Sequence, residues 1–371
     1  MTSPIVPPPG MPPTRTAPAW LEWSVAILST ALVVGVYLDG WAHIRELPEN
    51  FFSPWHGVIY GSFGLLALVL AWAAVSGRSR KGGWRHALAP GYGLSFVGAG
   101  LFMVAGAADF LWHAAFGIEA DIEALYSPPH LLLAAGGALV VTGPLRSSWK
   151  APSVSRAGLW RAVLATTLLL AMFTFFTAES HPFVHPWAWS KFEPRTLGPA
   201  ALGLPPLPAG GVGPRELAQT LGVSSFLIQS GILMGLALLL IRRWNFRLPF
   251  GWVTFMVGLN AIGLSIFHST PWVVPVAVVG GLVGDLLYRW LAPGTEARGR
   301  LRLWSASFPA ILYVLYFVAL FLQGGVWWTP HLWVGAIAIA GRSGWLVSYL
   351  VFPPPLPRGE SPALAREEAR A

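Results

Sequence analysis

An aspartate and two histidines stand close together where the first long apolar segment of the chain gives way to a short polar one. They are Asp39, His43 and His56. On a helix, Asp39 and His43 lie one turn apart on the same face. His56 follows Ser53 and Pro54, a pair typical of a helix start because proline fits the first turn, where its missing N–H costs no hydrogen bond. Side chains from two neighbouring helices can therefore reach one ion.

The pattern recurs 70 residues further on, where His130 follows Ser127 and Pro128, and Asp109 and His113 again stand four residues apart. One carboxylate with two imidazoles suits copper, iron or zinc, whereas magnesium and calcium prefer oxygen ligands. A hydrogen bond that joins two helix ends without a metal also fits each copy. The recurrence favours the metal, with Asp39, His43 and His56 as one site and Asp109, His113 and His130 as the second.

A third donor group follows the fifth apolar segment and comprises Glu179, His181 and His185. Prolines follow both histidines, so the four-residue spacing does not place them on a regular helix face. Metal binding by this group stays open. His268 and His331 stand alone, and we expect each to be a hydrogen-bonded histidine at the membrane interface.

The composition identifies an integral membrane protein. Of 371 residues, 54% are hydrophobic and only 11% are charged, which is too few to solvate a soluble globule. The 20 tryptophans fit interfacial belts. There are no cysteines, so disulfides and thiolate sites are excluded. The net charge of +8 does not indicate nucleic-acid binding, because the basic residues lie in loops on one membrane side without interleaved aromatic residues.

Apolar segments of about 20 residues, the length that crosses a bilayer, predict an all-α protein of ten transmembrane helices in five repeated hairpins. The predicted spans are residues 20–40, 55–76, 88–112, 129–146, 158–179, 217–241, 249–268, 272–291, 304–323 and 330–352. We expect one transmembrane domain over 19–353, in which 19–146 holds the duplicated motif hairpins and 181–216 an outer loop. A disordered proline-rich tail (1–18) and a second tail (354–371) flank it.

Lysine and arginine gather in the connections that follow the even-numbered spans. By the positive-inside rule these connections and both termini are cytoplasmic. The Asp-His motifs then lie on the non-cytoplasmic side of an inner (cell) membrane. Within the spans, Asn260 is expected to serve helix packing and Asp285 to pair with Arg289 one turn later.

The order Asp-x3-His-x8-Phe-Ser-Pro-x-His, formed here by Asp39, His43, Phe52 to Pro54 and His56, resembles the metal motif in the membrane-embedded C subunit of particulate methane and ammonia monooxygenases. The resemblance covers residues 20–145. It implies that an Asp and two His bind copper, and that a second copper site lies downstream. That family uses Asn, His and His at its second site, where this chain has Asp109, His113 and His130 with a longer final gap.

Three functions remain open. The first is a copper-binding membrane protein that handles metal or serves as the metal subunit of a membrane complex, with other membrane subunits or a second copy as partners. The second is an oxygen-dependent, monooxygenase-like oxidoreductase that acts on an apolar substrate, although the sequence shows no haem or flavin motif. The third is a transporter whose Asp-His pairs relay protons without metal.

If the first site binds metal, His43→Ala will remove most of the metal from it and leave the fold largely intact, because the substitution deletes a ligand at a helix end. Elemental analysis of the purified protein measures the loss. Wild-type protein that holds no transition metal after copper is offered would contradict the metal assignment.

Overall fold

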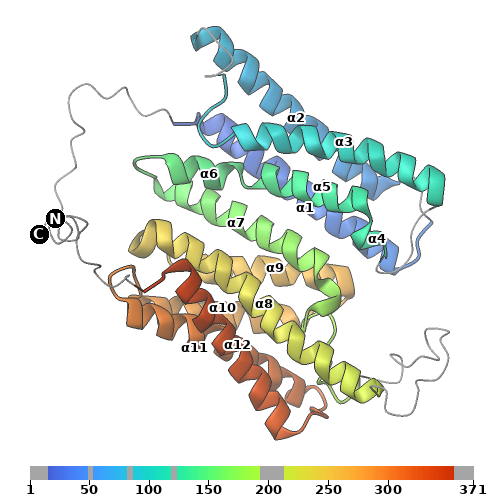
Figure 1. Ribbon diagram of the computed structural model, residues 1–371, viewed down its shortest axis with the longest axis vertical. Helices are drawn as coiled ribbons and strands as arrows, with labels where there is room; N and C mark the ends of the chain where they lie inside the picture. The colour runs from blue at the N-terminus through green and yellow to red at the C-terminus, as the bar shows by residue number, and fades with distance from the viewer. Residues whose placement is uncertain (1–15, 49–52, 82–86, 118–122, 193–212, 355–371) are drawn as a thin grey trace, which may run out of the picture.

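The structure is a computed structural model and describes residues 16–48, 53–81, 87–117, 123–192 and 213–354 (Figure 1). Over these residues the chain is all-helical, apart from an isolated bridge between Trp189 and Val326. The α-helices are α1 (Ala19–Ile44), α2 (Pro54–Lys81), α3 (Gly93–Phe116), α4 (Glu123–Tyr126), α5 (Pro128–Val141), α6 (Gly143–Lys150), α7 (Arg156–Phe176), α8 (Pro214–Trp244), α9 (Trp252–His268), α10 (Val273–Leu291), α11 (Arg298–Leu322) and α12 (Pro330–Val351). Two 3-10 turns are η2 (Ala178–Ser180) and η5 (Asn245–Arg247). Both predicted tails and the predicted outer loop lie in large part outside the described residues.

The prediction of many membrane-spanning helices is confirmed. In the described part of the chain, nine helical stretches are long and apolar enough to cross a membrane, and the shorter apolar helix α9 corresponds to the seventh predicted span. Large apolar side chains cover much of the outside, among them Leu68, Trp72 and Leu350, which are 67%, 66% and 81% exposed. Such a surface is stable only against lipid, so the bundle contacts a bilayer.

Four of the five predicted hairpins pack as neighbouring helix pairs: α1 with α2, α3 with α5, α9 with α10 and α11 with α12 (Figure 1). The remaining pair, α7 and α8, differs, because α7 packs chiefly on α9, α6 and α1 while α8 packs on α12. A long connection separates α7 from α8, so neither helix has to pack beside the other. At one end of the bundle, on the right in Figure 1, the C-terminal ends of α1 and α3 meet the N-terminal ends of α2 and α5.

The fourth predicted span is interrupted. α5 ends at Val141 and α6 begins at Gly143, with Pro144 in its first turn. Arg146 stabilises this break, since its guanidinium donates hydrogen bonds to the Leu139 carbonyl (2.6 Å) and the Ser95 hydroxyl (2.8 Å). The Leu139 carbonyl lies in the last turn of α5, where carbonyl groups lack a donor from their own helix.

Three aromatic rings from α1, α7 and α9 pack next to the first predicted metal site. Tyr37 lies 5.2 Å from Phe175, which lies 5.0 Å from Phe267, measured between ring centroids. Gly40 faces the two phenylalanine rings, and a Cβ atom at this position would collide with both. The absence of a side chain therefore lets α1 approach α7 and α9 closely, which fixes the position of the adjacent Asp39.

At the opposite end of α1, a buried ion pair joins it to α7. Glu22 and Arg161 are each 8% exposed, and the Arg161 guanidinium donates a hydrogen bond to the Glu22 carboxylate. The Ser147 hydroxyl of α6 donates to the other carboxylate oxygen at 2.8 Å. α1 is thus attached to α7 at both ends, by charge at one and by aromatic packing at the other.

The expected pairing of Asp285 with Arg289 is wrong. The Asp285 carboxylate accepts hydrogen bonds from the backbone N–H groups of Val253 (3.2 Å) and Thr254 (2.9 Å), at the start of α9. The Arg289 guanidinium lies over the Phe250 ring instead. Free N–H groups at a helix N-terminus attract a carboxylate, and tertiary packing brings Asp285 to one.

Replacement of Glu22 by glutamine will leave the Arg161 charge buried without its counterion, so we expect a loss of about 3–5 kcal/mol in the free energy of unfolding. Denaturant unfolding in detergent measures this loss. The matched control is Glu296→Gln, since Glu296 is exposed and should change stability by less than about 0.5 kcal/mol. Equal stability of the two variants would contradict the role assigned to the pair.

Candidate metal centre

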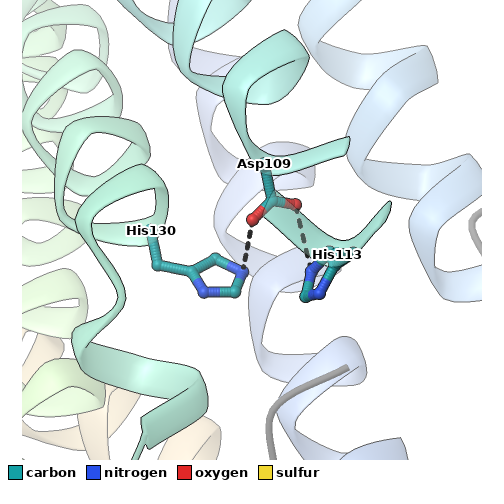
Figure 2. A group of neighbouring side chains, drawn as sticks. All are labelled: Asp109, His113 and His130. Carbon is teal, nitrogen blue, oxygen red and sulfur yellow. Dashed lines mark ion pairs between the residues drawn. The ribbon is translucent and has the colours of Figure 1, made fainter. Parts of the chain in front are cut away.

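The second motif forms a compact three-residue cluster. Asp109 and His113 come from the last two turns of α3, and His130 comes from the first turn of α5 (Figure 2). One ligand atom from each of the three lies within 4.8 Å of the others, and no other group among the described residues meets this criterion. The Asp109 Oδ2 atom lies 3.5 Å from His113 Nε2, and Oδ1 lies 3.4 Å from His130 Nε2.

The distances from the Asp109 oxygens to the two imidazole nitrogens are closer to the separation of two ligands on one metal ion than to the length of a hydrogen bond. Hydrogen bonds between nitrogen and oxygen span about 2.7–3.2 Å. Two ligand atoms that each lie about 2.1 Å from a tetrahedral ion are about 3.4 Å apart. The Asp109 Oδ1 atom is buried and accepts no hydrogen bond within the described structure. A buried carboxylate oxygen without a partner is costly, and a cation between the carboxylate and the imidazoles removes that cost.

The first motif is brought together in part. His56 Nε2 of α2 lies 3.0 Å from Asp39 Oδ1 of α1, which is an ordinary hydrogen-bond distance and shorter than the separations around Asp109. His43 lines the same cavity as these two side chains. The ligand atoms of the three do not all lie within 4.8 Å of one another, so this cluster is looser than the one around Asp109.

Both helix starts orient their histidines in the same way. The Ser53 hydroxyl lies 2.9 Å from His56 Nδ1, and the Ser127 hydroxyl lies 2.8 Å from His130 Nδ1. Ser127 is also the N-cap residue of α5. With one ring nitrogen held by a hydroxyl, the other nitrogen turns toward the carboxylate, an arrangement that orients metal-binding histidines in proteins. The sequence Ser-Pro-x-His thus begins the helix and orients the histidine.

The two clusters line one cavity. It has a volume of about 1640 Å³ and its wall includes Asp39, His56, Asp109 and His130. Tyr60, one turn after His56 on α2, stacks on the His56 ring at 5.7 Å and also lines this space. Sequence reasoning missed Tyr60, although its four-residue spacing from His56 was an available signal.

The structure does not bring the third predicted group, Glu179, His181 and His185, together as one cluster. His185 Nε2 lies 2.8 Å from Glu179 Oε2, and this hydrogen bond lowers the pKa of the Glu179 carboxyl below its usual value. His181 turns away into the core, where its Nδ1 accepts a hydrogen bond from the Phe183 N–H (3.0 Å). Instead His268, expected to stand alone, approaches His185 with 5.7 Å between ring centroids. No sequence spacing connects residues so far apart.

Comparison of the chain with protein-family models, curated proteins and solved structures finds no match. The resemblance to the monooxygenase C subunit therefore depends on the motif residues alone and stays a prediction.

Stability will depend on the protonation of His181, because burial lowers its pKa from 6.5 to about 3. Between these values the unfolded chain binds a proton that the folded chain does not, so stability falls as the pH falls. The largest slope for one such group is about 1.4 kcal/mol per pH unit. We expect His181→Gln to reduce this slope by up to that amount, measured by denaturant unfolding between about pH 6 and 4, while Glu179, whose pKa is also lowered, supplies part of the slope that remains. His331→Gln, which changes an exposed histidine, is the control and should keep the wild-type slope.

Proposed function

We propose that this protein is a multi-pass membrane protein that binds a transition metal ion at Asp109, His113 and His130, with a second site at Asp39, His43 and His56. The arrangement around Asp109 carries the proposal: three donor atoms converge from two helices, and a buried carboxylate oxygen has no hydrogen bond from the described residues. Glu179 and His185 form a hydrogen-bonded pair and need no metal.

The donor set limits the choice of ion. Two imidazoles and a carboxylate suit copper, iron or zinc, and the motif resemblance makes copper the first candidate. Three protein ligands leave at least one coordination position for another molecule. The ion's role is then metal handling, or service as the metal subunit of a larger membrane complex.

A second candidate function is an oxygen-dependent oxidoreductase of monooxygenase type. It is favoured by the cavity, whose wall places apolar side chains such as Phe63, Phe102 and Met172 beside the two clusters. An apolar substrate could reach a bound ion there without crossing water. This candidate requires turnover with oxygen and an electron donor, whereas metal handling requires only binding and exchange.

We expect purified wild-type protein to bind copper, and His130→Phe to lose the ion at the Asp109 site, because phenylalanine fills the same space without a ligand nitrogen. Ser127→Ala should weaken binding there by about 10- to 100-fold, the usual cost of losing a hydrogen bond that orients a metal ligand. Elemental analysis and equilibrium titration with copper, iron and zinc measure both effects.

Ser53→Ala is the matched control, since it removes the equivalent hydroxyl from the other motif and should leave the Asp109 site unchanged. If none of the three metals binds folded wild-type protein, the metal proposal is wrong and the clusters are hydrogen-bonded helix contacts.

A further inference from the structure

A charged side chain lies exposed in the middle of the last helix, α12, at the edge of the bundle remote from α2 and α3 (Figure 1). This helix is apolar enough to cross a membrane. Arg342 stands 12 residues after its start and nine before its end. Every other exposed charged side chain in the described helices lies within two turns of a helix end. Arg342 is therefore an exception among the outward-facing residues of the spans.

The face of α12 that carries Arg342 is otherwise apolar. Large side chains that are 41% to 81% exposed occupy the same side of the helix, namely Val334, Trp345, Leu346 and Leu350. The opposite side packs on α8 and α11. At 1.5 Å per residue, Arg342 lies roughly 14 Å from the nearer helix end. A hydrocarbon core is about 30 Å thick, so the guanidinium belongs to a residue near its middle.

A charge without a partner at this depth is costly. No ion pair or hydrogen bond joins Arg342 to another residue in the described ranges, whereas charged side chains within spans ordinarily pair or face the bundle interior. Arginines near helix ends avoid the cost because their side chains reach the membrane surface. Side chains on a helix point toward its N-terminus, and for Arg342 that end is roughly 18 Å away. The side chain is too short for this distance.

The same face has room for a neighbouring helix. Gly335 lies two turns before Arg342, and a Cβ atom there would meet nothing within 4 Å. Ala338, one turn before Arg342, is also exposed. Small residues let transmembrane helices approach closely, and an exposed tryptophan such as Trp345 is a residue type that dominates the binding energy of interfaces. A partner helix can thus bring a carboxylate against the guanidinium.

A second copy of this chain does not supply that carboxylate. In a symmetric pair formed through this face, Arg342 would meet the same face of the copy, and α12 contains no acidic residue. Through any other face, the described helices of the copy offer no exposed carboxylate near the middle of the membrane. The phosphate of an anionic lipid lies outside the hydrocarbon core.

We propose that this face of α12 binds a transmembrane helix of another membrane protein, and that an aspartate or glutamate near the middle of that helix pairs with Arg342. Arginine binds a carboxylate through two parallel hydrogen bonds, and the apolar residues before and after it pack on the partner. α12 contributes no residue to either Asp-His cluster or to their cavity. The inference therefore goes beyond the metal function and does not depend on it.

The first test measures binding of a defined probe to the full-length protein in dioleoylphosphatidylcholine vesicles. The probe is a synthetic transmembrane peptide of leucine and alanine with lysines at both ends and one glutamate at its centre. Energy transfer from a dye on the peptide to a dye on His331→Cys reports binding, since the chain has no other cysteine. We expect the glutamate peptide to bind roughly tenfold more tightly than the same peptide with glutamine, as polar contacts between transmembrane helices do.

Three variants identify the group that recognises the peptide. Arg342→Leu should abolish the difference between the two peptides, and Arg342→Lys should keep most of it because the charge remains. Arg300→Leu is the matched control, since it removes an exposed arginine at a helix end and should leave the difference unchanged. Equal binding of both peptides to the wild-type protein overturns the proposal.

The stability of the protein without any partner gives a second readout. We expect Arg342→Leu to raise the temperature of unfolding in nanodiscs that contain no other protein, because it removes an uncompensated charge from lipid. A lower temperature would reveal a stabilising contact within the chain, and an unchanged one would show that lipid compensates the charge. Either result overturns the proposal.

The oligomeric state of the wild-type protein tests the choice of partner. Light scattering in mild detergent should give the same mass for the wild-type protein and for Arg342→Leu. A dimer that Arg342→Leu dissociates would assign the face to a second copy and overturn the proposed partner.

Discussion

Two carboxylates inside a membrane bundle impose the constraint on which the rest of this structure depends. An isolated charge in a low-dielectric environment is costly unless a partner of opposite charge or a metal compensates it. Asp39 and Asp109 each face imidazoles, and the buried Asp109 Oδ1 atom accepts no hydrogen bond from the described residues. The cation that we propose at the Asp109 cluster would compensate the carboxylate charge and contact this oxygen.

The surrounding helices hold the clusters in place through contacts of different kinds. The glycine at position 40 brings α1 against the rings of Phe175 and Phe267, and the buried pair of Glu22 and Arg161 anchors the other end of the same helix. Each Ser-Pro-x-His segment begins a helix and orients its histidine by one hydroxyl contact. The backbone that forms the fold thereby also sets the direction of the histidine nitrogens, as the proposed metal site would require.

Residues of both motifs line the same cavity. Its polar end holds both Asp-His clusters and Glu179, and its apolar part follows α1 toward the middle of the bundle. Neither motif suggests such a space, since its walls come from α1, α2, α3, α5 and α7, and partly from α8 and α9. The volume between two hairpins depends on how closely they approach, which side-chain packing determines.

The sequence by itself determined the helical membrane class, the approximate spans and the pairing of Asp109 with His113 and His130, because apolar length and helical spacing are local properties of the chain. The orientation in the membrane and the duplication of the hairpins stay predictions. The tertiary structure alone decided that His181 turns inward, that His268 meets His185, and that Asp285 caps α9. Those contacts join residues distant in sequence or set apart by irregular backbone, and only the packing of whole helices brings such groups together.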